Sequence, residues 1–223
     1  VTQLRTGAAS GAAFDLLAVK GAKKGALIGT GGQAATQLEA MITARKLDEV
    51  KVYDVNSSRT EAFTAQMQEE LKAYGTKITA AKSSDEAIED ADLIVTVTPS
   101  SKPVFDGTKV KKGATVSCVG SYQHHMQEMD PAILTRASKI YFDSREAVLS
   151  EAGDILIPLE NGTISEKDFT GDLGEVVMGK ITARENDDEI IVFKTVGIAV
   201  QDLITAKKIY EKAVIERAGL SWN

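Results

Sequence analysis

The fold is decided by the stretch Lys24-Gly25-Ala26-Leu27-Ile28-Gly29-Thr30-Gly31-Gly32-Gln33-Ala34, in which an apolar strand runs into Gly-x-Gly-x-x-Ala. A helical segment follows, and a second strand, Val50–Asp54, ends in an acid twenty residues after Ala34. A strand, this glycine pattern, a helix and an acid at that distance are typical of a dinucleotide-binding βαβ unit. The sequence therefore predicts a bound dinucleotide.

Each small residue of the pattern has a mechanical reason. Gly29 allows a sharp turn out of the strand, Gly31 lets the backbone approach a pyrophosphate, and Ala34 lets the helix lie close to the sheet. The phosphates are expected at the free N–H groups of the helix N-terminus. Taken alone, the glycines fit an ordinary turn equally well. The strand before them and the acid after them favour the dinucleotide site.

Asp54 predicts which dinucleotide is bound. Its carboxylate is expected to accept hydrogen bonds from the adenosine ribose hydroxyls, and its charge repels a 2′-phosphate. NAD(H) is therefore the expected cofactor. NADP(H) stays open as the less favoured alternative, because Asn56 and Arg59 follow Asp54 and an arginine there reaches toward a 2′-phosphate.

Strands and helices alternate beyond this unit, which predicts an α/β fold with a Rossmann-type doubly wound parallel sheet. A long amphipathic helix is expected from about Val196 to Ala218, stopped by Gly219 and lying outside the nucleotide fold. We expect an NAD-binding domain over 1–194, and a C-terminal helix over 195–223 that belongs to a second, truncated substrate and dimerisation domain. The expected strands and helix starts are strands 77–80, 93–98, 115–119, 139–142 and 189–193, and helices beginning near 57, 84, 131 and 173.

Composition narrows the class of protein. The chain has 223 residues, 43% of them hydrophobic, and a net charge of −6 without a basic cluster, which argues against nucleic acid as a partner. No apolar run approaches the roughly 20 residues that span a bilayer, so no membrane partner is expected. The single cysteine, Cys118, lies in an apolar strand and is interpreted as a buried hydrophobe. One cysteine excludes an internal disulfide, and a cytoplasmic location is expected.

Two segments are expected to frame the nicotinamide, because ligands of open α/β sheets bind beyond the carboxyl ends of the strands. They are Thr96–Pro99 and Val119–Tyr122. Thr96 and Thr98 are equally well explained as ordinary strand residues. Thr195-Val196-Gly197 is expected to open the last helix, with free N–H groups for a carboxylate or the nicotinamide amide, and a plain helix start is the alternative.

The ordered set of motifs resembles the ornithine cyclodeaminase/mu-crystallin family, which includes archaeal-type alanine dehydrogenases and reductases of cyclic ketimines. The resemblance covers essentially the whole chain and is far more specific than the glycine pattern alone. It rests on Leu4–Ser10, Gly29–Ala34, Thr96–Thr98, Leu173–Val176 and Phe193–Asp202.

The resemblance implies roles for individual residues. Arg5 matches an arginine that clamps the substrate carboxylate, a role that suits a planar bidentate donor. Gly32 and Gln33 match a phosphate-contacting pair. The resemblance also assigns Asp54 to the ribose, Thr96 and Ser117 to Gly120 to the nicotinamide side, and Thr195 and Val196 to the neighbourhood of nicotinamide and substrate.

The sequence departs from the family pattern in two places. Members carry a segment ahead of the Leu4–Thr6 motif that holds further carboxylate-binding residues and much of a dimer surface, so we expect this chain to be part of a larger protein and a homodimer. Ornithine cyclodeaminases have an aspartate where Tyr122 stands. A tyrosine with a pKa near 10 is a poor general base at neutral pH, although it donates a hydrogen bond. No catalytic residue is assigned beyond the candidate Tyr122.

We therefore expect an NAD(H)-dependent oxidoreductase that moves a hydride to or from the α carbon of a small imino or amino acid, with a cyclic ketimine such as 1-pyrroline-2-carboxylate as the favoured substrate. Positioning does most of the work in this chemistry. Ornithine cyclodeaminase and a non-catalytic, mu-crystallin-like dinucleotide-binding protein are the alternatives. No metal is expected, because adjacent histidines such as His124 and His125 diverge in an extended loop.

Overall fold

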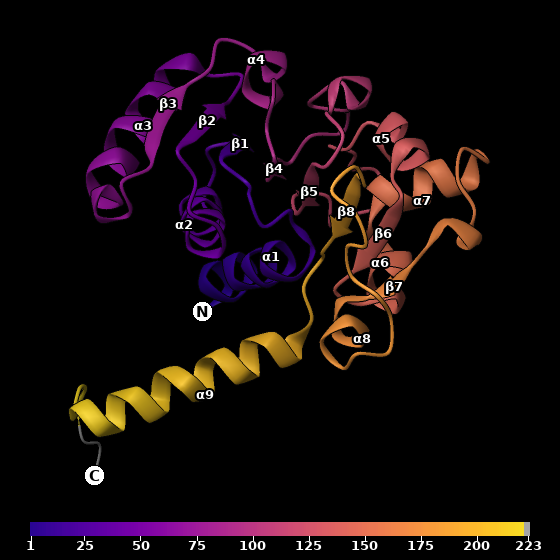
Figure 1. The fold of residues 1–223 in the computed structure, drawn as a ribbon. Coiled ribbons are helices and arrows are strands. Elements are labelled where there is room, and N and C mark those ends of the chain that lie inside the picture. Colours follow the sequence, from indigo (N-terminus) through magenta and orange to yellow (C-terminus); the bar gives the residue numbers. More distant parts are fainter. Residues whose placement is uncertain (221–223) are drawn as a thin grey trace.

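The computed structural model describes residues 1–220 and shows an α/β fold around one parallel sheet (Figure 1). The strands lie in the order β3-β2-β1-β4-β5-β8-β6-β7, and every neighbouring pair is parallel. The doubly wound parallel sheet expected from the sequence is confirmed. The strands are β1 Lys24–Ile28, β2 Glu49–Tyr53, β3 Lys77–Ala80, β4 Leu93–Thr96, β5 Thr115–Cys118, β6 Lys139–Phe142, β7 Gly171–Asp172 and β8 Ile191–Lys194.

Helices cover both faces of the sheet, because successive apolar residues of each strand point to opposite sides. In β1, Leu27 belongs to a buried cluster that includes residues of α1, α2 and α3, whereas Ile28 belongs to another that includes residues of α4, α5, α6 and α7. The helices are α1 Thr2–Leu17, α2 Ala34–Ala44, α3 Ser57–Glu70, α4 Ser84–Ile88, α5 Pro131–Arg136, α6 Arg145–Glu151, α7 Gly153–Glu160, α8 Leu173–Val177 and α9 Ala199–Glu216, with short 3₁₀ turns at Lys72–Tyr74, Gly107–Lys109 and Glu166–Asp168.

The order of the strands reverses between β1 and β4. Strands β2 and β3 continue from one side of β1, and the chain then crosses to β4 and β5 on the other. The loops that leave β1 and β4 therefore separate at the carboxyl edge of the sheet, which is where open α/β sheets bind ligands.

Two features of the fold go beyond what the sequence predicted. β8 inserts between β5 and β6, so the last strand in sequence becomes a central strand, and all four of its residues are buried. Helices α6 and α7 were not expected, because Gly153 and Pro158 interrupt the helical pattern of 145–160. Pro158 lies inside α7, in its last turn.

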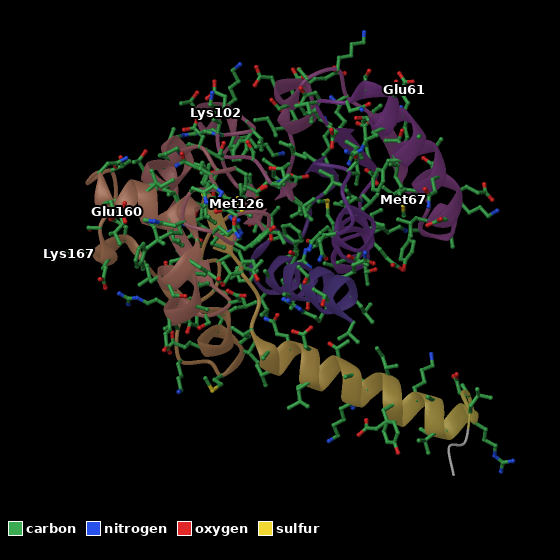
Figure 2. All side chains as sticks on the ribbon, turned by 180° about the vertical axis from the view of Figure 1, so that it is seen from behind. Glu61, Met67, Lys102, Met126, Glu160 and Lys167 are labelled. Carbon is green, nitrogen blue, oxygen red and sulfur yellow. The ribbon has the colours of Figure 1, made fainter. Side chains whose placement is uncertain are left out.

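The last helix begins three residues later than expected, at Ala199, with Ile198 as its N-cap. None of the residues of α9 is buried, and the helix runs away from the body of the molecule (Figure 1). Its side chains extend into open space on several sides (Figure 2). Arg217 adopts a left-handed backbone with φ of 52° at the C-cap. Residues 221–223 of the expected C-terminal segment lie outside the described residues.

Candidate dinucleotide site

A cavity of about 630 Å³ opens at the carboxyl edge of the sheet, where the strand order reverses. The structure brings five of the predicted cofactor residues into its wall: Gly29, Gly31, Asp54, Arg59 and Thr98. The loops after β1, β2 and β4 build most of this wall, and α4 adds Ser84. The other lining residues are Ile28, Thr30, Tyr53, Val55, Ser84, Val97, Pro99, Ser100, Pro103 and Val104.

The glycine loop has the geometry that a close backbone approach requires. Gly29 has φ of 104°, and a Cβ at this position would lie 2.7 Å from the Val97 carbonyl oxygen, so only glycine fits. A Cβ at Gly31 would meet nothing within 4 Å, which leaves open space beside its backbone. Ala34 is fully buried under the sheet. These observations support the mechanical roles predicted for the three residues.

The start of α2 follows closely on Gly31, which lines this cavity. Its N-cap, Gln33, forms no side-chain capping hydrogen bond. Gly32 is exposed, and only the side chain of Gln3 comes near the position of a Cβ there, at 3.6 Å. Neither Gly32 nor Gln33 lines the cavity, so their phosphate role stays a prediction. The N-terminal N–H groups of a helix are donors suited to an anion.

Asp54 is fixed by hydrogen bonds at the end of β2. Its Oδ2 accepts from the Thr30 N–H and hydroxyl, both at 2.9 Å, and its Oδ1 accepts from the Asn56 N–H at 3.0 Å. Burial raises the pKa of this carboxyl, but these hydrogen bonds and Arg59 outweigh burial and hold the pKa below its ordinary value of 3.8. Asp54 therefore carries its charge at neutral pH. The Arg59 guanidinium lies 3.9 Å away.

Asn56 does not line the cavity. Its side chain caps α3 by accepting a hydrogen bond from the Arg59 N–H at 3.0 Å. The Asn56 side chain thus stabilises the start of α3 as its N-cap. Its predicted contact with the cofactor stays untested.

Of Thr96, Thr98, Val119 and Gly120, all expected near the nicotinamide, only Thr98 lines the cavity. Thr96 is fully buried within β4 and does not reach the cavity, whereas Thr98 lies beyond the strand end and lines it. The N–H groups of Val119 and Gly120 donate to the Glu128 carboxylate at 3.0 and 2.6 Å. The candidate Tyr122 is 52% exposed on the loop that follows β5. Its catalytic role stays a prediction.

The expectation that Thr195–Gly197 opens the last helix with free N–H groups is wrong. The Val196 and Gly197 N–H groups donate to Asp143 Oδ2 at 3.2 and 2.7 Å, and the Thr195 hydroxyl donates to the same oxygen at 2.6 Å. The helix starts only at Ala199. The Asp143 carboxylate thus binds the N–H groups that were expected to be free for a ligand.

Arg5 belongs to α1, and its side chain reaches the first turn of α9. Its Nη1 donates to Gln201 at 3.3 Å and its Nε donates to Asp202 at 3.3 Å, with 13% of its side chain exposed. A Cβ on Gly197 would lie 1.9 Å from Nη1. The structure therefore brings Arg5 and Gly197, two predicted substrate residues, into contact.

Sequence reasoning missed a cluster of fully buried charges behind the ends of β4, β5 and β8. Glu128, Asp154 and Lys194 are each 0% exposed. Lys194 Nζ lies 3.3 Å from Asp154 Oδ2 and donates to the Cys118 carbonyl at 3.2 Å. Burial and the neighbouring Asp154 raise the pKa of Glu128, against the opposite effect of Lys194. The apolar runs around Asp154 and Lys194 were the available signal of their burial.

Other features are structural. Cys118 is free and fully buried, and burial raises the pKa of its thiol well above its ordinary value. His124 and His125 are exposed, and His124 contacts Glu160. The described residues contain no group of three metal-ligating side chains and no helix able to cross a membrane.

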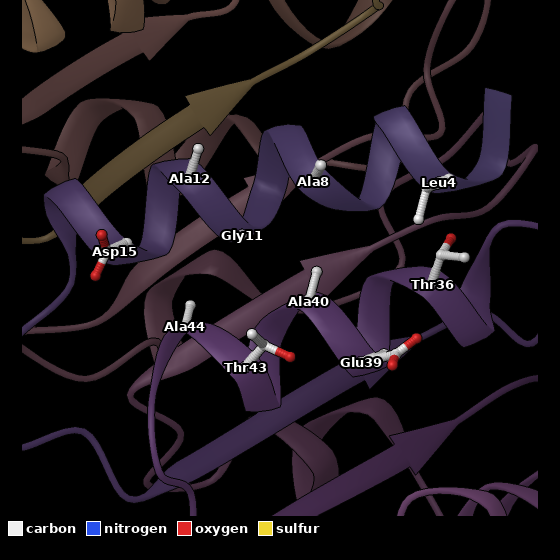
Figure 3. Close-up of a pocket in the computed structure, with 10 residues that line it drawn as sticks. All are labelled: Leu4, Ala8, Gly11, Ala12, Asp15, Thr36, Glu39, Ala40, Thr43 and Ala44. Carbon is white, nitrogen blue, oxygen red and sulfur yellow. The ribbon is translucent and has the colours of Figure 1, made fainter. Parts of the chain in front are cut away.

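A second cavity, of about 570 Å³, lies between α1 and α2 (Figure 3). It is an open groove, lined mainly by small side chains such as Ala8, Ala12 and Ala40, with Asp15 and Glu39 at its border. Its polar lining residues are Asp15, Thr36, Glu39 and Thr43, and none of the predicted cofactor residues lines it. The cavity at the strand reversal is therefore the candidate functional site.

The fold and the position of this cavity define a Rossmann-type α/β protein. The chain belongs to the ornithine cyclodeaminase/mu-crystallin family, whose model matches residues 1–217. It is 40% identical to the Δ1-pyrroline-2-carboxylate reductase of Bacillus cereus over 98% of this chain and 66% of that protein. The chain thus spans about two thirds of the length of the curated relatives that it matches.

Two solved structures are similar to this chain. The Δ1-pyrroline-2-carboxylate reductase of Thermococcus litoralis, in complex with NADH and L-proline, has a TM-score of 0.94 and 38% identity, over 99% of this chain and 67% of that one. An archaeal alanine dehydrogenase dimer with bound NAD has a TM-score of 0.88 and 35% identity, over 100% of this chain and 67% of that one.

Proposed function

We propose that this chain carries the dinucleotide-binding part of an NADH-dependent reductase of Δ1-pyrroline-2-carboxylate. The observation that carries the proposal is the match to the Thermococcus litoralis reductase with NADH and L-proline, with a TM-score of 0.94 over 99% of this chain. In the reaction, a hydride from NADH and a proton convert the C=N bond of the cyclic imine into the C–N bond of proline, and NAD⁺ is released.

The residues at the cavity fit such a cofactor. The ionised Asp54 suits the two hydroxyls of an unphosphorylated ribose, and the open backbone at Gly31 beside the start of α2 suits a diphosphate. Thr98, Val119 and Gly120 lie at the ends of β4 and β5, where the nicotinamide would lie. When bound, NADH supplies the hydride. NADPH is the less favoured cofactor.

Arg5 is assigned to the substrate carboxylate. Its guanidinium offers parallel N–H donors, which match a carboxylate in two-point contact. Gly197 contacts the Arg5 guanidinium. In this proposal the segment Thr195–Gly197 shapes the substrate pocket, and its N–H groups donate to Asp143 rather than to the substrate. An imine that is already protonated needs no strong general base, so the chain has mainly to position the two reactants.

The domain division is part of the same proposal. Residues 1–194 form the dinucleotide-binding domain, and 195–223 belong to a second domain for substrate binding and dimerisation. The absence of any buried residue in α9 supports this division, because an amphipathic helix of this kind needs a partner surface. A homodimer is proposed from the likeness to the dimeric alanine dehydrogenase, and a cytoplasmic location from the free thiol of Cys118.

The test is an NADH-oxidation assay on the intact protein. It compares 1-pyrroline-2-carboxylate, the six-membered piperideine-2-carboxylate, and pyruvate with ammonia. The proposal predicts the highest kcat/KM for a cyclic imine, with proline formed from the first substrate. Ammonia release from ornithine without net NADH consumption would select a cyclodeaminase instead, and NADH binding without turnover on any imine would select a non-catalytic binding protein.

A further inference from the structure

Glu128 joins two loops at the carboxyl edge of the sheet. Its Oε2 accepts hydrogen bonds from the Thr98 N–H at 2.7 Å and the Thr98 hydroxyl at 2.9 Å. Its Oε1 accepts from the N–H groups of Val119 and Gly120 at 3.0 and 2.6 Å. One carboxylate oxygen thus serves the loop after β4, and the other serves the loop after β5.

These loops follow neighbouring strands and approach each other closely. Thr96 of β4 pairs with Cys118 of β5, so Thr98 and Gly120 leave the sheet side by side. A Cβ on Gly120 would lie 2.0 Å from the Thr98 carbonyl oxygen. Thr98 also lines the dinucleotide cavity. The loop after β5 thus packs against one end of the cavity wall, at Thr98.

Glu128 is itself held from behind. The N–H groups of Glu128 and Met129 both donate to Asp154 Oδ1 at 2.8 Å, and Asp154 faces the Lys194 ammonium. The Val104 N–H donates to the Glu128 carbonyl at 2.9 Å. Because Glu128, Asp154 and Lys194 are fully buried, solvent does not replace these contacts when one of them is lost.

The chemistry of the bridge requires an acceptor on both sides. Three of the four donors are backbone N–H groups, which never accept a hydrogen bond. An amide in place of the carboxylate has to turn its NH₂ group toward one of the loops. That NH₂ group then faces a hydrogen-bond donor and cannot bond with it. A side chain shorter by one methylene keeps the charge but does not span both loops.

We infer that Glu128 is a positioning residue of the proposed reductase, which holds the loops after β4 and β5 at the spacing that receives the nicotinamide ring. The inference rests on the proposed function, because it needs a dinucleotide in the cavity. Glu128 acts through Thr98, Val119 and Gly120 and touches no substrate. The adenosine end of the cavity, at Asp54, does not depend on it.

The experiment compares Glu128→Gln and Glu128→Asp with the intact wild-type protein. NADH and ADP-ribose, which lacks the nicotinamide ring, are the two probes of binding. Loss of one hydrogen bond to a buried charge corresponds to about tenfold or more in an equilibrium constant. We expect both variants to bind NADH about tenfold more weakly and to transfer hydride more slowly, while the Kd for ADP-ribose stays within about twofold of wild type.

Thr76→Val is the matched control. It removes a buried hydrogen bond, from the Thr76 hydroxyl to the Leu47 carbonyl at 2.8 Å, at the other end of the sheet. It lowers Tm without changing the ratio of the two Kd values. The inference is overturned if the Glu128 variants bind NADH like wild type, or weaken NADH and ADP-ribose equally.

Hydrogen exchange on the wild-type protein covers the case in which neither variant folds. The amides of Thr98 and Gly120 should be protected without cofactor, and fast exchange at both would overturn the bridge. The Val119 amide is not used, because it also donates to the Thr96 carbonyl at 2.9 Å. The two proposals also fail separately. A wild type that binds NADH but reduces no imine refutes the reductase alone, whereas an active wild type with unaffected Glu128 variants refutes the positioning role alone. A wild type that binds no NADH refutes both.

Discussion

The guanidinium of Arg5 lies directly against the backbone of Gly197, so closely that a Cβ on Gly197 would be 1.9 Å from Nη1. The contact joins α1 to the segment that leads into α9, two parts of the chain that are distant in sequence. Gly197 also has φ of 87°, which side-chain-bearing residues rarely adopt. Any residue larger than glycine therefore has to displace Arg5 and strain its own backbone.

Gly197→Ala should raise the KM for the imine about tenfold or more, because it moves the proposed carboxylate-binding group. Gly162→Ala is the control for backbone strain alone. Gly162 has φ of 77°, and a Cβ there would meet nothing within 4 Å. Steady-state kinetics of the two variants check the prediction. Equal KM values in both would show that the contact with Arg5 does not matter to substrate binding.

Arg5→Lys should also raise the KM for the imine, with a smaller effect on kcat. A lysine keeps the charge but gives up the paired N–H donors that grip both carboxylate oxygens. Arg145→Lys, in an exposed pair with Glu166, is the control and should leave KM unchanged. An unchanged KM for Arg5→Lys and Arg5→Ala alike would remove Arg5 from the substrate site.

Asp54→Ser should weaken NADH binding and improve NADPH binding, because it removes a charge that repels a 2′-phosphate. In the wild type the pKa of Asp54 lies below 3.8, so the carboxylate stays charged as the pH falls to about 5. A 2′-phosphate takes up a proton near pH 6. The wild-type preference for NADH should therefore shrink below about pH 6. Titrations of both coenzymes across this range check this, and an unchanged preference in Asp54→Ser would contradict the ribose assignment.

The carboxylate of Asp92 should make the free energy of unfolding decrease at low pH. It accepts hydrogen bonds from the Lys23 and Lys24 N–H groups at 2.7 and 2.9 Å and pairs with Lys111 at 2.6 Å. Burial alone would raise the pKa of Asp92, but these contacts outweigh burial and hold the pKa below its ordinary value of 3.8. A lowered pKa stabilises the fold above the unfolded value and loses that effect as the pH falls below it.

Urea unfolding at about pH 7 and about pH 3 checks this prediction. Asp92→Asn should cost stability at the higher pH and much less at the lower one. A difference between variant and wild type that does not change with pH would exclude the charge of Asp92 as the cause.

The sequence predicted those parts of the site that depend on local backbone chemistry. Gly29 needs a positive φ and Asp54 ends a strand at a fixed distance, and both requirements are visible in a short stretch of residues. β8 was recognised as a strand, but its place between β5 and β6 depends on pairing across distant segments, which no local pattern reports. The same limit hid the partners of Glu128, which come from the loops after β4 and β5 and from α7.

The free N–H groups expected at Val196 and Gly197 illustrate a second limit. The pattern correctly predicted a helix in this region but placed its start too early. Asp143, more than fifty residues earlier, binds the N–H groups of Val196 and Gly197 ahead of the helix, and no local pattern reports that contact. The roles of Gly32, Gln33, Thr96 and Tyr122 stay predictions.

Hydride transfer itself is tested most directly by isotope. The intact protein is supplied with NADH carrying deuterium at C4, on each face in turn, together with 1-pyrroline-2-carboxylate, and the proline formed is analysed by NMR. The account predicts deuterium at the α carbon of proline from one of the two labelled forms. Proline without deuterium from either form, or no proline at all, would contradict it.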